Sequence, residues 1–198
     1  MDTQQVTNVL VTIVEGQGDV EAVPVLVRRL LALRGQYWDL KPIRVKRQKV
    51  VKPEELERAI KLAVLQGCAS VLVVLDADKD CPAELGPGLQ ARAEAVAPGL
   101  PVAVVLANQE FEAWLLGGID GLRGRRGISA EPTPVPDPDA ITSPKGRLER
   151  EMGERSYLET DDQAAFAALM DIEAAERRSR SFRKLIAELG RIIPPIGA

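Results

Sequence analysis

The chain has 198 residues, of which 45% are hydrophobic and 28% charged, and its formal net charge is −3. This balance predicts one globular domain with a core that needs no disulfide scaffold, and the charge alone gives no sign of a nucleic-acid binder. Histidine is absent, which excludes histidine triads, histidine-ligated zinc and histidine general bases.

No apolar run approaches the ~18 residues that a membrane span needs, and no basic segment leads into an apolar one at the N-terminus. The sequence therefore predicts neither a membrane segment nor a signal peptide. The two cysteines, Cys68 and Cys81, are expected to be free thiols, which fits a cytoplasmic protein.

In chain order, residues 1–118 alternate between short apolar runs and segments with helical spacing. Buried strands are expected at 6–14, 71–75 and 101–107, an exposed alternating strand at 41–52, and helices at 20–33, 53–66, 89–96 and 109–116. This alternation predicts an α/β core with a mainly parallel sheet covered by helices on both faces, a Rossmann-like three-layer fold. In such folds functional groups collect at the carboxyl ends of the strands.

Residues 119–198 are expected to form an extension packed on this core. Glycine and proline are frequent from 117 to 146, which predicts a long loop or partly mobile segment. Short helices are expected to follow, between 145 and 189.

Acidic residues follow two of the predicted buried strands. Glu15 follows the first strand, and Asp76 and Asp78 follow the second. If the strands are neighbours, these carboxylates converge and repel one another unless a cation is present. Mg²⁺ or Mn²⁺, held by oxygen ligands, is the cofactor that such a cluster indicates. Further candidate metal ligands nearby are Asp19, Asp80, Glu110 and Glu112.

The competing interpretation is that these acids are ordinary loop residues or helix caps. For Asp19 or Asp80 alone that interpretation is at least as good. For Glu15, Asp76 and Asp78 together it is weaker, because two separate strands end in acids.

At these residues the chain resembles Toprim-like proteins, a group that includes type IA topoisomerases, bacterial primases and the overcoming-lysogenization-defect nucleases. More closely, it resembles a bacterial Toprim-like family of unassigned function whose members often occur beside ATP-binding partner proteins. The motifs that carry the resemblance are VEGQGD at 14–19, LDADKD at 75–80, QEFEAWLLG at 109–117, SPKGRLE at 143–149 and RSFRKLIAEL at 180–189.

The resemblance implies a Toprim fold and divalent-metal binding. It implies that Glu15 is an acid/base or metal-linked residue and that Asp76 and Asp78 are metal ligands. Nucleases of this type carry a second acid four residues after the first glutamate, and here that position holds the shorter Asp19. Lys145 is a second candidate catalytic residue, because its ammonium group would stabilise a phosphate if the loop before it folds back over the site.

The function expected is therefore a metal-dependent nuclease or related phosphoryl-transfer enzyme acting on nucleic acid, with defence or repair as its setting. The alternative is a non-catalytic Toprim-like subunit that regulates or binds an ATPase partner. A third hypothesis, a receiver-like domain phosphorylated on Asp76, fits the acid pattern poorly. Candidate phosphate contacts are a basic strip (Lys41, Arg44, Lys46, Arg47, Lys49 and Lys52) and a basic loop (Arg123, Arg125 and Arg126).

Overall fold

The structure, a computed structural model of the chain, describes residues 8–46, 52 and 54–194. Its centre is a four-stranded, all-parallel sheet in the order β2-β1-β3-β4. The α/β class with a parallel sheet is thus confirmed. The strands and helices are β1 (Val9–Val14), α1 (Asp19–Ala32), β2 (Asp39–Arg44), α3 (Glu55–Leu65), β3 (Ser70–Asp76), α4 (Pro82–Val96), β4 (Val102–Ala107), α5 (Glu112–Gly117), the 3₁₀ helices η1 (Ile119–Leu122) and η2 (Pro138–Ala140), α6 (Pro144–Glu151), the π-helical turn η3 (Glu159–Gln163), α7 (Ala164–Leu169), α8 (Ile172–Arg178) and α9 (Arg180–Ile192).

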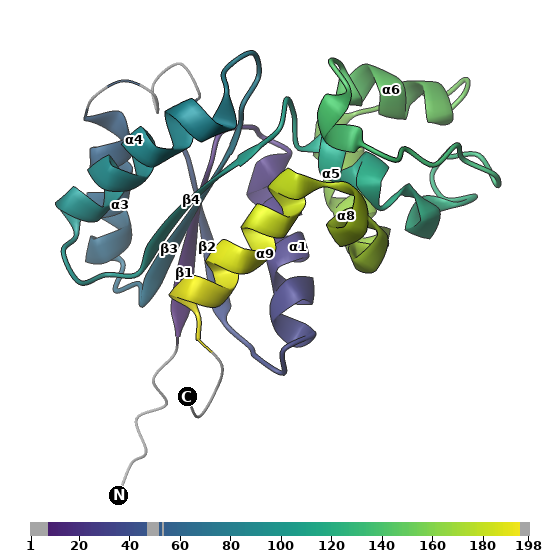
Figure 1. Cartoon of the computed structure of the whole chain (residues 1–198). Coiled ribbons are helices and arrows are strands. Elements are labelled where there is room, and N and C mark those ends of the chain that lie inside the picture. The colour runs from purple at the N-terminus through teal and green to yellow at the C-terminus, as the bar shows by residue number, and fades with distance from the viewer. Residues whose placement is uncertain (1–7, 47–51, 53, 195–198) are drawn as a thin grey trace, which may run out of the picture.

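Helices cover both faces of the sheet. Helices α3 and α4 lie on one face, and α1 and α9 lie on the other (Figure 1). The buried strand residues alternate between the two cores: Leu10 and Val14 of β1 join the α1/α9 side, while Val11 and Ile13 join the α3/α4 side. Burial on both faces explains why β1, β3 and β4 are continuous apolar runs instead of alternating ones.

The segment from α5 to α8 forms a helical region beside the carboxyl end of the sheet (Figure 1). Its largest buried side chain, Trp114, packs edge-on against Phe182 of α9, with the ring centroids 5.7 Å apart. Helix α7 packs against α1, and α9 packs back on β4. These contacts join the helical region to the sheet in one continuous core.

Two segments differ from the sequence-based expectation. The Pro/Gly stretch at 82–88 is helical, the first half of α4, instead of a loop. Pro82 stands at the helix start, where no N–H is needed, and the carbonyl that Pro87 leaves without a donor belongs to the exposed Ala83, where water can reach it. Strand β2 spans Asp39–Arg44, whereas the strand predicted from the sequence spanned 41–52. Arg47 and Lys49 of the basic strip lie outside the described residues.

The Gly/Pro-rich segment is anchored instead of forming a free loop. Ile128 and Val135 are buried in the main core. The Asp139 carboxylate accepts hydrogen bonds from the Arg180 and Ser181 backbone N–H groups, at 2.7 and 3.0 Å, and so caps α9. The Ser179 hydroxyl caps the same helix through the Phe182 N–H and separates α8 from α9.

Candidate functional site

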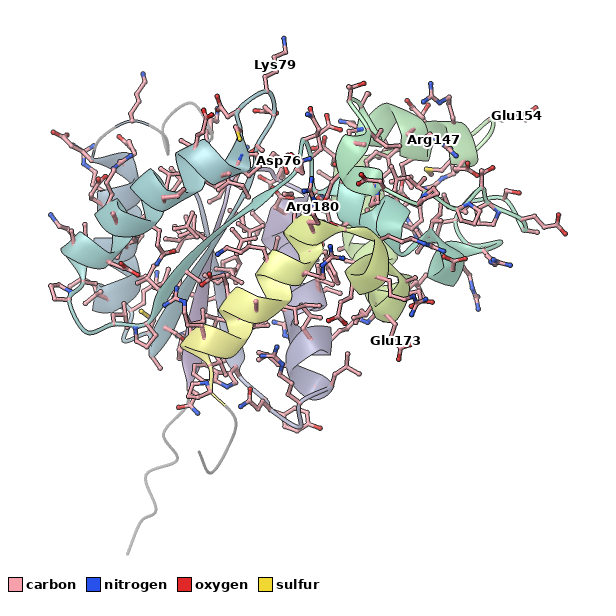
Figure 2. All side chains as sticks on the ribbon, in the orientation of Figure 1. Asp76, Lys79, Arg147, Glu154, Glu173 and Arg180 are labelled. Atoms are coloured by element: carbon pink, nitrogen blue, oxygen red, sulfur yellow. The ribbon has the colours of Figure 1, made fainter. Side chains whose placement is uncertain are left out.

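Glu15 and Asp76 lie where the strand order of the sheet reverses. The chain moves from β1 outward to β2, then returns to the other side of β1 to add β3 and β4. In open parallel sheets this switch point leaves a crevice at the carboxyl ends of the two central strands, where ligands bind. Glu15 directly follows β1 and Asp76 ends β3. Figure 2 shows Asp76 at this edge, between the sheet and the helical region.

Asp76 lies among other carboxyl groups. Burial raises its pKa well above the usual value, and the negative charges of Asp19, Glu112 and Glu15 raise it further. A hydrogen bond of 2.8 Å from the Phe111 N–H to Asp76 Oδ1 acts in the opposite direction but is outweighed. The fold therefore gathers these four acids within electrostatic range of one another.

Asp19 is fixed by two hydrogen bonds at the start of α1. Its Oδ2 accepts the Gly16 N–H at 2.8 Å, and its Oδ1 accepts Nε2 of Gln163 at 3.0 Å. Burial is the main reason why the pKa of Asp19 is raised. The bond to Gly16 also fits the local role of a turn and helix-start residue, so Asp19 serves the fold whether or not it binds a ligand.

The glycines of the VEGQGD motif allow this close packing. A Cβ on Gly18 would overlap Oε1 of Gln163 and lie 2.8 Å from the Glu159 carbonyl oxygen. A side chain at Gly18 would thus push the η3 turn away from the end of β1. The motif therefore brings Asp19 and the η3 turn of the extension into contact.

Glu112 forms a buried pair with a tyrosine of the extension. Its Oε1 accepts the Tyr157 hydroxyl at 2.9 Å, and only 3% of the residue is exposed. Burial raises the pKa of Glu112 to about 7, although the Tyr157 hydrogen bond lowers it. The pKa of Tyr157 is raised as well, by burial and by the Glu112 charge. Glu112 therefore exchanges its proton near neutral pH.

Lys145 reaches the same group of acids from the start of α6. Its backbone N–H donates to Oε2 of Glu110 at 2.8 Å, and its ammonium group forms an ion pair with Glu159. The Glu159 hydrogen bond, together with the nearby Glu112 and Glu110 charges, raises the pKa of Lys145. The segment before α6 thus places a cation beside the acids, as expected if it folds back over the site.

Asp78 and Asp80 lie apart from the buried group. Both are exposed on the turn after β3, as is Lys79, which points away from the molecule in Figure 2. The turn is held by bonds from the Asp78 N–H to the Gln109 carbonyl and from the Asp80 N–H to the Ala77 carbonyl, both 2.9 Å. In residues 8–46, 52 and 54–194, no three Asp, Glu or Cys side chains stand close enough together to hold a metal ion.

Sequence reasoning missed the residues that the extension adds. Tyr157, Glu159 and Gln163 contact Glu112, Lys145 and Asp19, respectively. They lie about 140 residues after Glu15 in sequence, as the separation of 144 between Gln163 and Asp19 shows. The acidic turn ETDDQ carries no recognised motif, so no local signal marks these residues.

Three arginines of the basic loop and the basic strip bind neighbouring groups of the protein. Arg126 and Arg123 of the basic loop form ion pairs with Asp162 and Asp120. Arg44 of the basic strip binds the Glu15 carbonyl and the Gln17 side chain at 3.1 and 2.9 Å, so it supports the turn after β1. These arginines hold the local structure together.

No helix in the described part of the chain is long and apolar enough to cross a membrane. Comparison with curated proteins and with solved structures finds no match. A family model does match, from the last residue of β1 to α9, and so covers both the strand-end acids and the extension that completes the site. Because this match spans residues 14–190, the chain belongs to the family described as a domain of unknown function, DUF4276.

Proposed function

We propose that this chain is a divalent-metal-dependent nuclease, or a related phosphoryl-transfer enzyme acting on nucleic acid, of the Toprim-like type. The observation that carries the proposal is the position of Asp76, which is partly buried at the switch point of the sheet among Glu15, Asp19 and Glu112. Buried acids that raise one another's pKa destabilise the site until a cation neutralises them. Two free thiols fit the cytoplasmic location that we propose with this activity.

The donor chemistry of the site fits Mg²⁺ or Mn²⁺. All the candidate ligands are oxygen atoms, which these ions prefer. The side-chain amide oxygen of Gln163, Oε1, is a further candidate ligand, since it is buried near Asp19 and has no hydrogen-bond partner among the described residues. The side chains would have to draw together around the ion, with Asp76 and Glu15 on rigid strand ends and Asp78 on the exposed turn.

A divalent cation bound there supplies charge neutralisation at a phosphate and a lower pKa for the attacking water. The protein supplies the rest. Glu15 is the acid/base candidate, at the end of β1 beside Asp76. Lys145 offers its ammonium group to a phosphate oxygen in exchange for Glu159. That exchange costs little, because both side chains are about two-fifths exposed, at 44% and 41%.

The test is a cleavage time course with the purified chain, supercoiled plasmid and a single-stranded oligonucleotide, each with Mg²⁺, Mn²⁺ or EDTA. We expect metal-dependent cleavage that Asp76→Asn and Asp78→Asn each lower by about 100-fold or more. Asp39→Asn is the matched control, because it changes a carboxyl group at the start of β2, at the edge of the sheet opposite the site. It should cleave like the wild type. Equal cleavage by all four proteins would assign the activity to a contaminant and contradict the proposal.

The alternative, a non-catalytic subunit of an ATPase partner, predicts a different result. It predicts no cleavage with any metal and a stable complex with the ATPase that Asp76→Asn does not weaken.

A further inference from the structure

A groove of about 880 Å³ runs along the outer edge of β4, between α4 and α9. Val104 and Leu106 of β4 lie in its floor, Ala83 and Gly86 belong to the α4 wall, and Arg180 and Lys184 belong to the α9 wall. We call it the β4 groove. Its volume is in the range of sites that bind ligands, and it lies outside the group of acids described above.

The floor of the β4 groove carries unpaired backbone groups. The bonds from the Val71 N–H to the Pro101 carbonyl and from the Ala77 N–H to the Ala107 carbonyl show that odd-numbered β4 residues face β3. The backbone groups of Val102, Val104 and Leu106 therefore face outward. In the described part of the chain, the Val104 carbonyl and both backbone groups of Leu106 have no hydrogen-bond partner. Buried backbone groups of this kind need a partner.

Two side chains already bind this edge: Arg191 donates to the Val102 carbonyl at 2.6 Å, and Gln90 pairs with the edge as another strand would. The Gln90 amide donates from Nε2 to the Val102 carbonyl at 2.8 Å and accepts the Val104 N–H on Oε1 at 2.7 Å. A primary amide thus takes the place of one peptide group of a further strand. The next pairing positions, at Val104 and Leu106, are open to a ligand.

The α4 wall is shaped for a close approach. Its residues facing the groove include Ala83, Gly86 and Pro87, none of which has a long side chain. A Cβ on Gly86 would make only an ordinary contact, 3.5 Å from a Leu106 methyl group. A backbone can therefore lie against Leu106 without meeting a bulky side chain from α4, since the longer Gln90 and Glu94 stand further along the groove.

Among the described residues, the ion pairs of the β4 groove leave the Arg180 side chain without an acidic partner. Each acid that lines it is engaged: Glu188 pairs with Lys184 and Arg191, Glu94 accepts the Gln90 amide, and Asp139 accepts the N–H groups that begin α9. The Arg180 side chain has no ion pair among the described residues. Figure 2 shows Arg180 at the end of α9 that lies near Asp76. An occupant therefore gains most from a negative charge near the carboxyl end of β4.

From this geometry we propose that the β4 groove binds an extended peptide segment of a partner protein, which adds to β4 as a fifth strand and carries an acidic residue that pairs with Arg180. Backbone bonds to Val104 and Leu106 supply affinity, and the acid supplies specificity. The site is independent of the metal chemistry proposed above, so either proposal can fail without the other.

The test is selection of a phage library of random seven-residue peptides on the full chain, followed by Kd measurements with the enriched peptides made synthetically. We expect enrichment of sequences that contain Asp or Glu. Ala83→Trp should fill the β4 groove and weaken binding at least tenfold. Arg180→Gln should weaken it about fivefold, the usual effect of one partly exposed ion pair.

Two substitutions serve as matched controls. Glu84→Trp places the same bulk on α4 outside the groove, and Arg150→Gln removes a charge from the exposed surface of α6. Both should bind like the wild type, and an N-methyl group on the central peptide bonds of the ligand should abolish binding.

Other results would overturn the proposal. No enrichment, or enrichment that Ala83→Trp leaves unchanged, would remove the peptide site. A dimer in sedimentation analysis that only Ala83→Trp dissociates would assign the groove to a second copy of this chain. An oligonucleotide that competes with the selected peptides and depends on Arg180 would assign it to nucleic acid.

Discussion

Two carboxylates in this protein, Asp162 and Asp76, lie in opposite electrical environments. Asp162, whose side chain is completely buried, pairs with Arg126 and Arg155 and accepts the Leu158 N–H at 3.0 Å. Burial opposes its ionisation, but these donors outweigh burial and lower its pKa. Asp76 is partly buried, and its pKa is raised well above the usual value by burial and then by the negative charges of Asp19, Glu112 and Glu15.

The contrast separates an acid that the fold neutralises from one around which the fold gathers further acids. At Asp162 the fold supplies the positive charge that a buried carboxylate needs, so the ion pairs are complete without a ligand. At Asp76 the fold collects further negative charge, which lowers stability unless something else compensates. Such an arrangement is typical of sites at which a cation arrives from outside.

The first prediction removes the charge of Asp162, the acid that the fold neutralises. Asp162→Asn leaves Arg126 and Arg155 without their counter-charge and should lower the free energy of unfolding by about 3 kcal/mol. Both arginine side chains are 39% exposed, so water keeps the cost below that of fully buried cations. Urea denaturation followed by circular dichroism measures the change.

The neighbouring Asp161→Asn is the control, since the Asp161 carboxylate is exposed and accepts only the adjacent Thr160 hydroxyl. A loss below about 0.5 kcal/mol in Asp162→Asn, the range of ordinary surface changes, would show that the ion pairs are not a structural centre.

The second prediction uses pH to follow the group of acids in the absence of metal. The pKa of Glu112 is about 7 in the folded chain and 4.5 by its ordinary value. Between these values the unfolded chain releases a proton that the folded chain keeps. Stability should therefore fall as pH rises, by about 2 kcal/mol between pH 5 and pH 7, and level off above the folded pKa.

The raised pKa values of Asp19 and Asp76 act in the same direction. Denaturation curves at several pH values, in EDTA, test this. Glu112→Gln keeps an acceptor for Tyr157 and should show a smaller dependence. A wild-type stability that increases from pH 5 to pH 7 would contradict the charge crowding inferred here.

The sequence allowed the sheet and its acidic edge to be predicted because both follow from local patterns. The β-branched runs at β1, β3 and β4 marked the buried strands, and Glu15 and Asp76 followed from their positions at strand ends. Lys145 was a candidate because the loop before it could fold back over the site and bring its ammonium group to a phosphate.

The rest depends on long-range contacts that have no local signal. The turn that contributes Gln163 and Glu159 packs closely beside the end of the first strand because Gly18 has no side chain. Neither segment carries a sequence pattern that predicts this contact. The helical form of 82–88 was missed because proline and glycine favour loops, while the packing of Leu89 and Ala93 on the sheet supports a helix. The motif alone could not show that Asp76 is partly buried whereas Asp78 is exposed.

The third prediction joins stability to metal binding. Asp76→Asn replaces a partly buried acid with a neutral group of the same shape, whose oxygen can still accept the Phe111 N–H. In EDTA at pH 7.5 it should raise the free energy of unfolding by about 1–3 kcal/mol, because a carboxyl group that ionises at a cost is removed.

In Mg²⁺ or Mn²⁺ the stability of the wild type should increase relative to that of Asp76→Asn. The wild type should gain stability with metal concentration, by about 2.7 kcal/mol at a hundredfold excess over the dissociation constant, whereas Asp76→Asn and Asp78→Asn should not. Melting curves with and without metal supply the comparison, with Asp39→Asn as control. An equal metal response in Asp78→Asn would remove Asp78 from the ligand set.

The smallest expected effect comes from the hydrogen bond between Tyr157 and Glu112. Tyr157→Phe removes the donor but keeps the ring that stacks on Phe166, with the centroids 6.1 Å apart. We expect a loss of about 1 kcal/mol at pH 7. Because the Tyr157 bond lowers the pKa of Glu112, its removal should also shift the fall in stability to higher pH. Tyr37→Phe, at a tyrosine that is 85% exposed, is the matched control and should change neither quantity. If Tyr157→Phe lowered stability without moving the pH profile, the tyrosine would serve packing alone, and the buried pair would have no part in setting the charge of the site.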